Sequence, residues 1–151
     1  MKTYKTNTKR FEIKANDSTF PKAQINSSKD SAEFIRQFYS DDIEIYESFY
    51  MLLLNNANNT IGYVKISQGG VVGTVVDYAI IAKYAIESLA RGVIIAHNHP
   101  SGSLTPSNQD NKLTAKIRQG LQLFDITLLD HVILSKNGYY SYADEGNSAL
   151  N

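Results

Sequence analysis

The stretch VIIAHNHP, residues 93–100, decides the fold and points to the chemistry of this chain. Its first half is a short apolar run rich in β-branched residues, which predicts a buried strand. Its second half places His97 and His99 two residues apart, so both imidazoles leave an extended chain on the same side. Pro100 then keeps His99 extended and fixes the direction of the chain. The stretch therefore predicts a strand that ends in two histidines facing one point.

A carboxylate follows at the start of the next predicted helix. Ser107 is a typical N-cap residue, and Asp110 lies three residues later, on the same helix face. Two imidazoles and one carboxylate are a ligand set of catalytic zinc, with a fourth position left for water. The same spacing is also that of a capping box, and an acidic first turn suits the helix dipole. For Ser107 both interpretations hold together, because a cap uses one lone pair and leaves the O–H free.

Water bound to such an ion needs a group that takes its proton. Zinc lowers the pKa of bound water toward about 7, and a glutamate outside the ligand set can accept the proton. The candidates are Glu44, Glu47 and Glu87. We favour Glu47, because a carboxylate inside an apolar strand is costly to bury without a partner. The alternative is a strand-end residue that points to water. The hydroxyl of Ser107 is a candidate donor to the developing oxyanion.

Two further residues near the motif favour structural roles. His131 lies inside an apolar run, and we expect it to be hydrogen-bonded in the sheet rather than to bind metal or relay protons. Asn98 lies between the two histidines, and we expect its side chain to bond the backbone of a neighbouring loop. The glycine-rich residues 69–73 lack the Lys-Ser/Thr ending of a phosphate loop and predict a turn.

The remaining pattern is typical of one α/β domain. Helices are predicted after the caps Ser27, Asp77 and Ser107, the second of them stopped by Gly92. Strands are predicted at residues 47–54, 61–67, 93–96, 126–134 and 139–142, with a hairpin turn at residues 136–138. Several tight turns between strands favour a sandwich with a mixed central β-sheet flanked by helices.

We divide the chain into three parts. Residues 1–41 form an N-terminal extension with a short helix, expected to cover a sheet edge. Residues 42–145 form the domain, and residues 146–151 a loose tail.

Composition restricts the class of protein. Lys and Arg together number 15, as do Asp and Glu, and this balance argues against a strongly basic nucleic-acid-binding protein. Cysteine is absent, which excludes disulfides and thiolate zinc sites. The apolar runs are too short to cross a bilayer, and the N-terminus lacks the apolar segment of a signal peptide. We therefore expect a cytoplasmic protein with no membrane partner.

Together, His97-x-His99-Pro100-x6-Ser107-x2-Asp110 and an upstream glutamate resemble the JAMM motif of the JAB/MPN metalloprotease superfamily. Residues 97–102, and the run at residues 129–131, are similar to the RadC branch of that superfamily. The resemblance covers about residues 46–144. It implies a JAB/MPN-like, cytidine-deaminase-like α/β architecture.

The resemblance also assigns roles to the motif residues. It implies that Zn²⁺ is held by His97, His99 and Asp110, that Glu47 is the general base, and that Ser107 supports the oxyanion. The implied activity is hydrolysis of peptide or isopeptide bonds in a peptide or protein substrate.

Two other functions compete with hydrolysis. RadC proteins are associated with DNA repair, which implies a nucleic-acid-binding or protein-binding module without proteolytic activity. The scattered N-terminal lysines give nucleic-acid binding little support, because such scatter is typical of a solvated surface. Full-length RadC proteins carry a helix-hairpin-helix-type N-terminal region, which the first 40 residues do not resemble. A non-catalytic interaction domain of the same fold is disfavoured, because all five motif positions are present.

Overall fold

The structure, a computed structural model, describes residues 1–2, 7–70 and 75–151. Residues 71–73 of the predicted glycine-rich turn lie outside the described residues. The elements in chain order are α1 (Ser28–Arg36), the 3₁₀ helix η1 (Asp41–Glu44), β1 (Ser48–Leu54), β2 (Thr60–Gln68), α2 (Tyr78–Glu87), β3 (Gly92–Asn98), α3 (Asn108–Gln122), β4 (Thr127–Leu134) and β5 (Tyr139–Ser141). Within the described residues, no helix has both the length and the apolar character that a membrane span needs.

The strands form one five-stranded sheet in the order β2-β1-β3-β4-β5. Only β3 and β4 run parallel to each other, and the other neighbours are antiparallel. The predicted α/β class with a mixed central sheet is confirmed. The predicted hairpin turn joins β4 to β5, where Ser135 N donates to Gly138 O across 3.0 Å.

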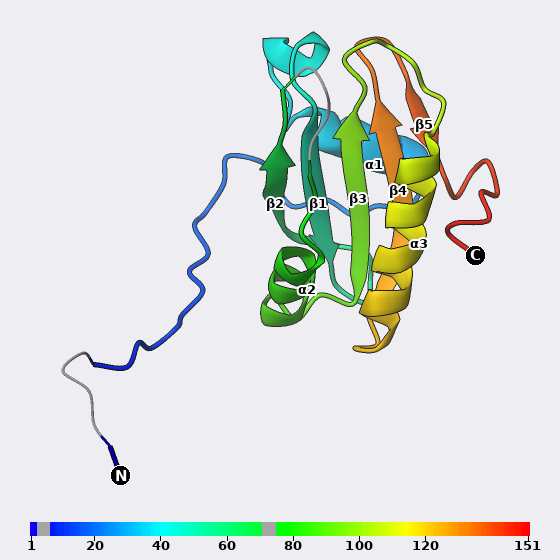
Figure 1. Cartoon of the computed structure of the whole chain (residues 1–151). Coiled ribbons are helices and arrows are strands. Elements are labelled where there is room, and N and C mark those ends of the chain that lie inside the picture. Colours follow the sequence, from blue (N-terminus) through cyan, green and yellow to red (C-terminus); the bar gives the residue numbers. More distant parts are fainter. Residues whose placement is uncertain (3–6, 71–74) are drawn as a thin grey trace.

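Helices cover both faces of the sheet (Figure 1). On one face, α2 and α3 pack on alternate residues of β3 such as Val93 and Ile95. On the other face, α1 packs on the intervening residues, Ile94 and Ala96. Because side chains alternate along a strand, His97 continues the row of Val93 and Ile95 and points to the face that α3 covers.

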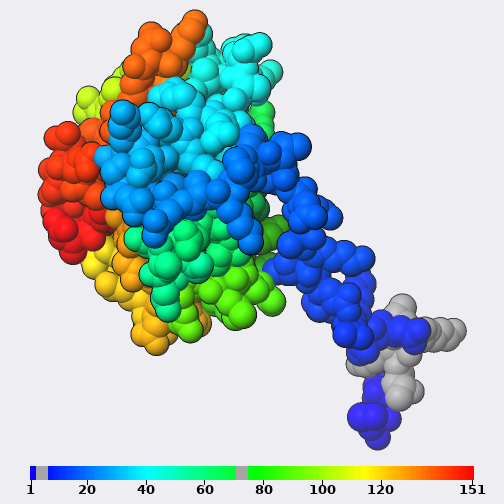
Figure 2. Space-filling model, turned by 180° about the vertical axis from the view of Figure 1, so that it is seen from behind, coloured from blue at the N-terminus to red at the C-terminus, as the bar shows by residue number. Residues whose placement is uncertain are grey.

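The N-terminal segment contributes to both an edge and a face. At the start of the edge strand β2, Thr60 N donates to Ala23 O across 2.8 Å, so the expected edge contact is present there. However, α1 lies on the sheet face (Figure 1), and its residues Ala32 and Ile35 are buried in the core. The predicted division after residue 41 therefore separates α1 from the sheet on which it packs. Residues 7–19 are exposed and project away from the sheet (Figures 1 and 2).

The end of α2 differs from the prediction. The helix ends at Glu87, and Leu89 follows with φ of 56°, the left-handed conformation that closes many helices. Gly92 is instead the first residue of β3, where a Cβ atom would lie 2.7 Å from Cδ1 of Leu129. The prediction that Gly92 stops the helix is therefore wrong. At this position the glycine leaves room for the Leu129 side chain of the neighbouring strand β4.

The C-terminal residues are held against the domain. Asn147 Nδ2 donates to Tyr140 Oη across 3.2 Å, and Leu150 packs against the core on the α3 side. The prediction that residues 146–151 are loose is wrong. The mostly polar composition of residues 146–151 did not indicate the contacts of Asn147 and Leu150 with the domain.

Candidate metal centre

The carboxyl end of β3 meets the N-terminus of α3 at one end of the sheet. His97 is the second-last residue of β3, and His99 follows the strand directly. Ser107 caps α3, and Asp110 lies in its first turn. The three residues predicted as ligands, His97, His99 and Asp110, therefore come together from two elements.

The spacing of these side chains fits a metal ion. The two Nε2 atoms of His97 and His99 are 2.9 Å apart. Asp110 places Oδ1 3.3 Å from Nε2 of His97 and Oδ2 3.4 Å from Nε2 of His99. Ligand atoms about 2.1 Å from zinc at the tetrahedral angle lie about 3.4 Å from one another. Among the described residues, this is the group of histidine, aspartate and glutamate side chains that could hold a metal ion.

The hydrogen bonds of the cluster also favour a cation. His99 Nδ1 lies 2.8 Å from Ser103 O, and a carbonyl oxygen can only accept. In the neutral ring, Nε2 of His99 is therefore an acceptor that faces the carboxylate of Asp110. Burial tends to raise the pKa of Asp110, but when the facing rings of His97 and His99 carry a proton on Nε2, their hydrogen bonds outweigh burial and hold this pKa well below its usual range. The hydrogen bond with Asp110 in turn raises the pKa of His99, against the opposing effect of burial.

Glu47 lies beside the ligand cluster. It directly precedes β1 rather than lying within it, and its Oε1 is 3.9 Å from Nε2 of His97. Burial raises the pKa of Glu47, although His97 and His99 oppose the shift. The other candidate glutamates lie elsewhere: Glu44 is paired with Lys136 at the surface, and Glu87 is exposed at the end of α2. Of the three predicted candidates, the structure brings only Glu47 to the cluster.

Asn98 holds the backbone around Glu47. Its buried amide donates to Ile43 O across 2.6 Å and to Tyr46 O across 2.7 Å. Its Oδ1 accepts from Ser48 N at 2.8 Å. The predicted role of Asn98, bonding a neighbouring loop backbone, is confirmed. Because these bonds lie on both sides of Glu47, they set its position relative to β3.

Ser107 and Asp110 also form the capping box that their spacing predicts. Ser107 Oγ accepts from Asp110 N at 3.0 Å, and Asp110 Oδ2 accepts from Ser107 N at 2.7 Å. The box orients the carboxylate, so that Oδ1 turns toward His97. Within the part of the chain that the structure describes, the Ser107 hydroxyl donates to no protein group and is free to bind another acceptor.

His131 lies behind the cluster, completely buried on β4. Its Nε2 is 2.8 Å from Nδ1 of His97, and its Nδ1 is 2.6 Å from Oγ1 of Thr114 on α3. Burial lowers the pKa of His131 well below that of an ordinary histidine, so the ring is neutral. The predicted structural role agrees with these contacts. Sequence analysis missed Thr114, although it lies four residues after Asp110 and so shares its helix face.

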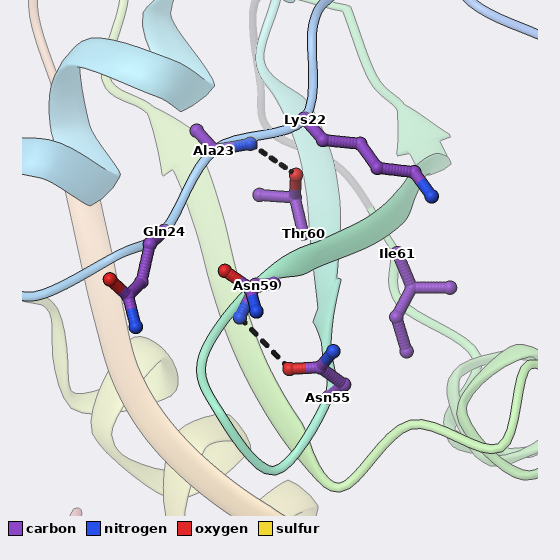
Figure 3. A pocket seen from close by; sticks show the side chains of 7 residues that line it. All are labelled: Lys22, Ala23, Gln24, Asn55, Asn59, Thr60 and Ile61. Atoms are coloured by element: carbon purple, nitrogen blue, oxygen red, sulfur yellow. Dashed lines mark hydrogen bonds between the residues drawn. The ribbon is translucent and has the colours of Figure 1, made fainter.

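The hollow drawn in Figure 3 is a different feature. It lies at the other end of β1, between residues 22–24 and the β1–β2 turn, where Asn59 N donates to Asn55 Oδ1 across 3.0 Å. Its lining is neutral apart from Lys22. It therefore has no set of metal ligands and no pair of groups for acid–base chemistry.

Comparison with known proteins identifies the family of this chain. A family model described as RadC-like JAB domain matches residues 25–147. The chain belongs to the RadC-like JAB domain family. The resemblance inferred from the motif is thus confirmed, and the matched region includes α1.

Several similar proteins carry the name UPF0758. The UPF0758 protein of Flavobacterium johnsoniae is 40% identical over 123 residues, which cover 82% of this chain and 53% of that protein. The UPF0758 protein YfjY of Escherichia coli K12 is 41% identical over 100 residues, covering 66% of this chain and 62% of YfjY. This RadC-like JAB domain chain spans about half the length of most of the curated relatives that it matches.

Proposed function

We propose that this RadC-like JAB domain is a zinc-dependent hydrolase of peptide or isopeptide bonds. The observation that carries the proposal is the convergence of His97, His99 and Asp110 on one point, with Glu47 beside it. Bound zinc would act as a Lewis acid and lower the pKa of a water at the fourth position.

The protein side chains carry out proton transfer and stabilise the developing negative charge. Glu47 Oε1 accepts a proton from the attacking water and returns it to the leaving nitrogen. Its raised pKa suits both steps, because a stronger base takes the proton more readily than an ordinary carboxylate. The Ser107 hydroxyl donates to the carbonyl oxygen of the substrate as negative charge develops there.

The variant Glu47→Gln tests this assignment. We expect it to bind zinc as the parent does and to lose at least about 100-fold in turnover, because the amide cannot accept the proton. Cleavage is measured on a peptide library and on a lysine ε-amide-linked peptide by mass spectrometry, and zinc content by elemental analysis.

Glu44→Gln is the matched control, since Glu44 is also a candidate glutamate in the sequence but pairs with Lys136 at the surface. It should cleave at the parental rate. The proposal fails if the parent binds no zinc, or if Glu47→Gln cleaves as fast as the parent.

A further inference from the structure

A buried chain of hydrogen bonds connects one candidate ligand to the backbone of another. It runs from His97 Nδ1 to His131 Nε2 across 2.8 Å, and from His131 Nδ1 to Thr114 Oγ1 across 2.6 Å. It ends where Thr114 Oγ1 donates to the carbonyl oxygen of Asp110 across 2.6 Å. His97, His131 and Thr114 are each at most 1% exposed. Water therefore has no access with which to replace a missing partner.

The protons in this chain can be arranged in two directions. In the first, Thr114 donates to Asp110 O, His131 Nδ1 donates to Thr114, and His97 Nδ1 donates to His131. Nε2 of His97 then carries a lone pair that faces Asp110 and His99. In the second, Thr114 donates to His131 Nδ1 and His131 Nε2 donates to His97 Nδ1, so that Nε2 of His97 carries a proton. Only the first direction permits His97 to bind a metal through Nε2.

The carbonyl of Asp110 selects the first direction. A carbonyl oxygen can only accept, and it lies 2.6 Å from Thr114 Oγ1. In the second direction, two oxygen atoms would face each other at this distance with no proton between them. Threonine in a helix commonly donates to the carbonyl four residues earlier, which is the relation of Thr114 to Asp110.

We infer that Thr114 and His131 are positioning residues that hold His97 in the tautomer protonated at Nδ1. The inference rests on the proposed zinc site and extends it. The tautomer of His99 needs no such chain of hydrogen bonds, because Nδ1 of His99 donates directly to Ser103 O. The partner of His97 is an imidazole, which accepts or donates according to its own tautomer, so a third group must set the direction.

Replacement of Thr114 tests the inference. Thr114→Val keeps the shape and removes the oxygen, so that His131 Nδ1 loses its acceptor. We expect zinc affinity, measured by competition with a chromophoric chelator, to fall about 10–100-fold. Thr114→Ser retains the hydroxyl and should bind zinc as the parent does. Thr60→Val is the matched control, because Thr60 is also buried but accepts from Ala23 N at the other end of the sheet.

A second measurement needs neither zinc nor activity. The chain has three histidines, so nitrogen NMR of the ¹⁵N-histidine-labelled, metal-free protein at alkaline pH reports each ring. We expect His97 to be protonated at Nδ1 in the parent and in Thr114→Ser. In Thr114→Val, we expect Nε2 of His97 to gain proton occupancy.

The outcomes separate the inference from the proposed function. Equal zinc affinity of the parent and Thr114→Val overturns the inference, as does a parental His97 protonated at Nε2. A parent that binds no zinc overturns the proposed function, and the NMR result then decides the inference. A parent that binds zinc and cleaves nothing leaves the inference standing, provided that Thr114→Val weakens binding.

Discussion

Two of the three candidate ligands, His99 and Asp110, each use one polar atom to orient another. His99 donates from Nδ1 to Ser103 O, and Asp110 accepts at Oδ2 from Ser107 N. The atoms left over, Nε2 of His99 and Oδ1 of Asp110, point at the common centre. Bonds of this kind fix tautomer and ring orientation before a metal arrives. At the residue scale, the cluster is therefore preorganised by its own hydrogen bonds.

Zinc affinity should fall as the pH is lowered from 8 to 5.5. A histidine binds zinc only when its coordinating nitrogen is unprotonated, so protons compete with the metal. The hydrogen bond with Asp110 raises the pKa of His99, so competition begins at a higher pH than for a free imidazole with a pKa of about 6.5. Chelator competition at several pH values measures the effect. An affinity that does not change over this range contradicts the expected protonation of His99.

The position of Glu47 in the site depends on the register of β1 against β3. In the antiparallel pair of β1 and β3, Phe49 lies opposite His97. This register places Glu47, two residues before Phe49, beside the end of β3. Asn98 then ties the backbone on both sides of Glu47 to β3. At the element scale, the position of the proposed base depends on strand pairing as well as on its own side chain.

The N-terminus of α3 allows stability and activity to be separated. Ser107→Ala should destabilise the fold by about 1 kcal/mol, whereas Ser107→Gly should cost only a few tenths, because glycine is tolerated at an N-cap. Both variants lack the hydroxyl, so both should lose about 10-fold or more in turnover. Urea unfolding and cleavage rates measure the two effects. If Ser107→Gly retains parental turnover, the hydroxyl acts only as a helix cap.

The whole molecule brings the ligands together through the parallel pairing of β3 and β4. The crossover between these strands is α3, so the end of β3 and the start of α3 lie at the same end of the sheet (Figure 1). The α1 helix packs on the opposite face and supports β3 from behind. Because the ligands come from two elements, a bound ion would join them as a cross-link.

Zinc should therefore stabilise the complete fold. At a free zinc concentration of about 100 times Kd, binding to the native state adds about 2.7 kcal/mol, which for this size corresponds to a rise in Tm of about 5–10 °C. Calorimetry of the chelator-treated protein with and without zinc measures the shift. His99→Ala should abolish it. A parental Tm that does not respond to zinc contradicts the proposed site.

Much of this site is local in the chain and could be predicted without coordinates. The alternation along β3 and the capping box of α3 depend on residues a few positions apart, so spacing alone indicates where His97, His99 and Asp110 point. Apolar periodicity likewise predicts the strands and helices, and hence the α/β class. These features depend on local backbone geometry, which neighbouring residues determine.

Contacts between segments that are distant in the sequence could be identified only in the folded structure. Spacing did not distinguish Glu47 from Glu44 and Glu87, because the choice depends on the register of β1 against β3. The contact of His131 with His97 and Thr114 depends on three elements packing together, and the burial of α1 depends on which sheet face remained open. Such contacts are decided by the packing of the whole sheet and its helices, which no short stretch of sequence encodes.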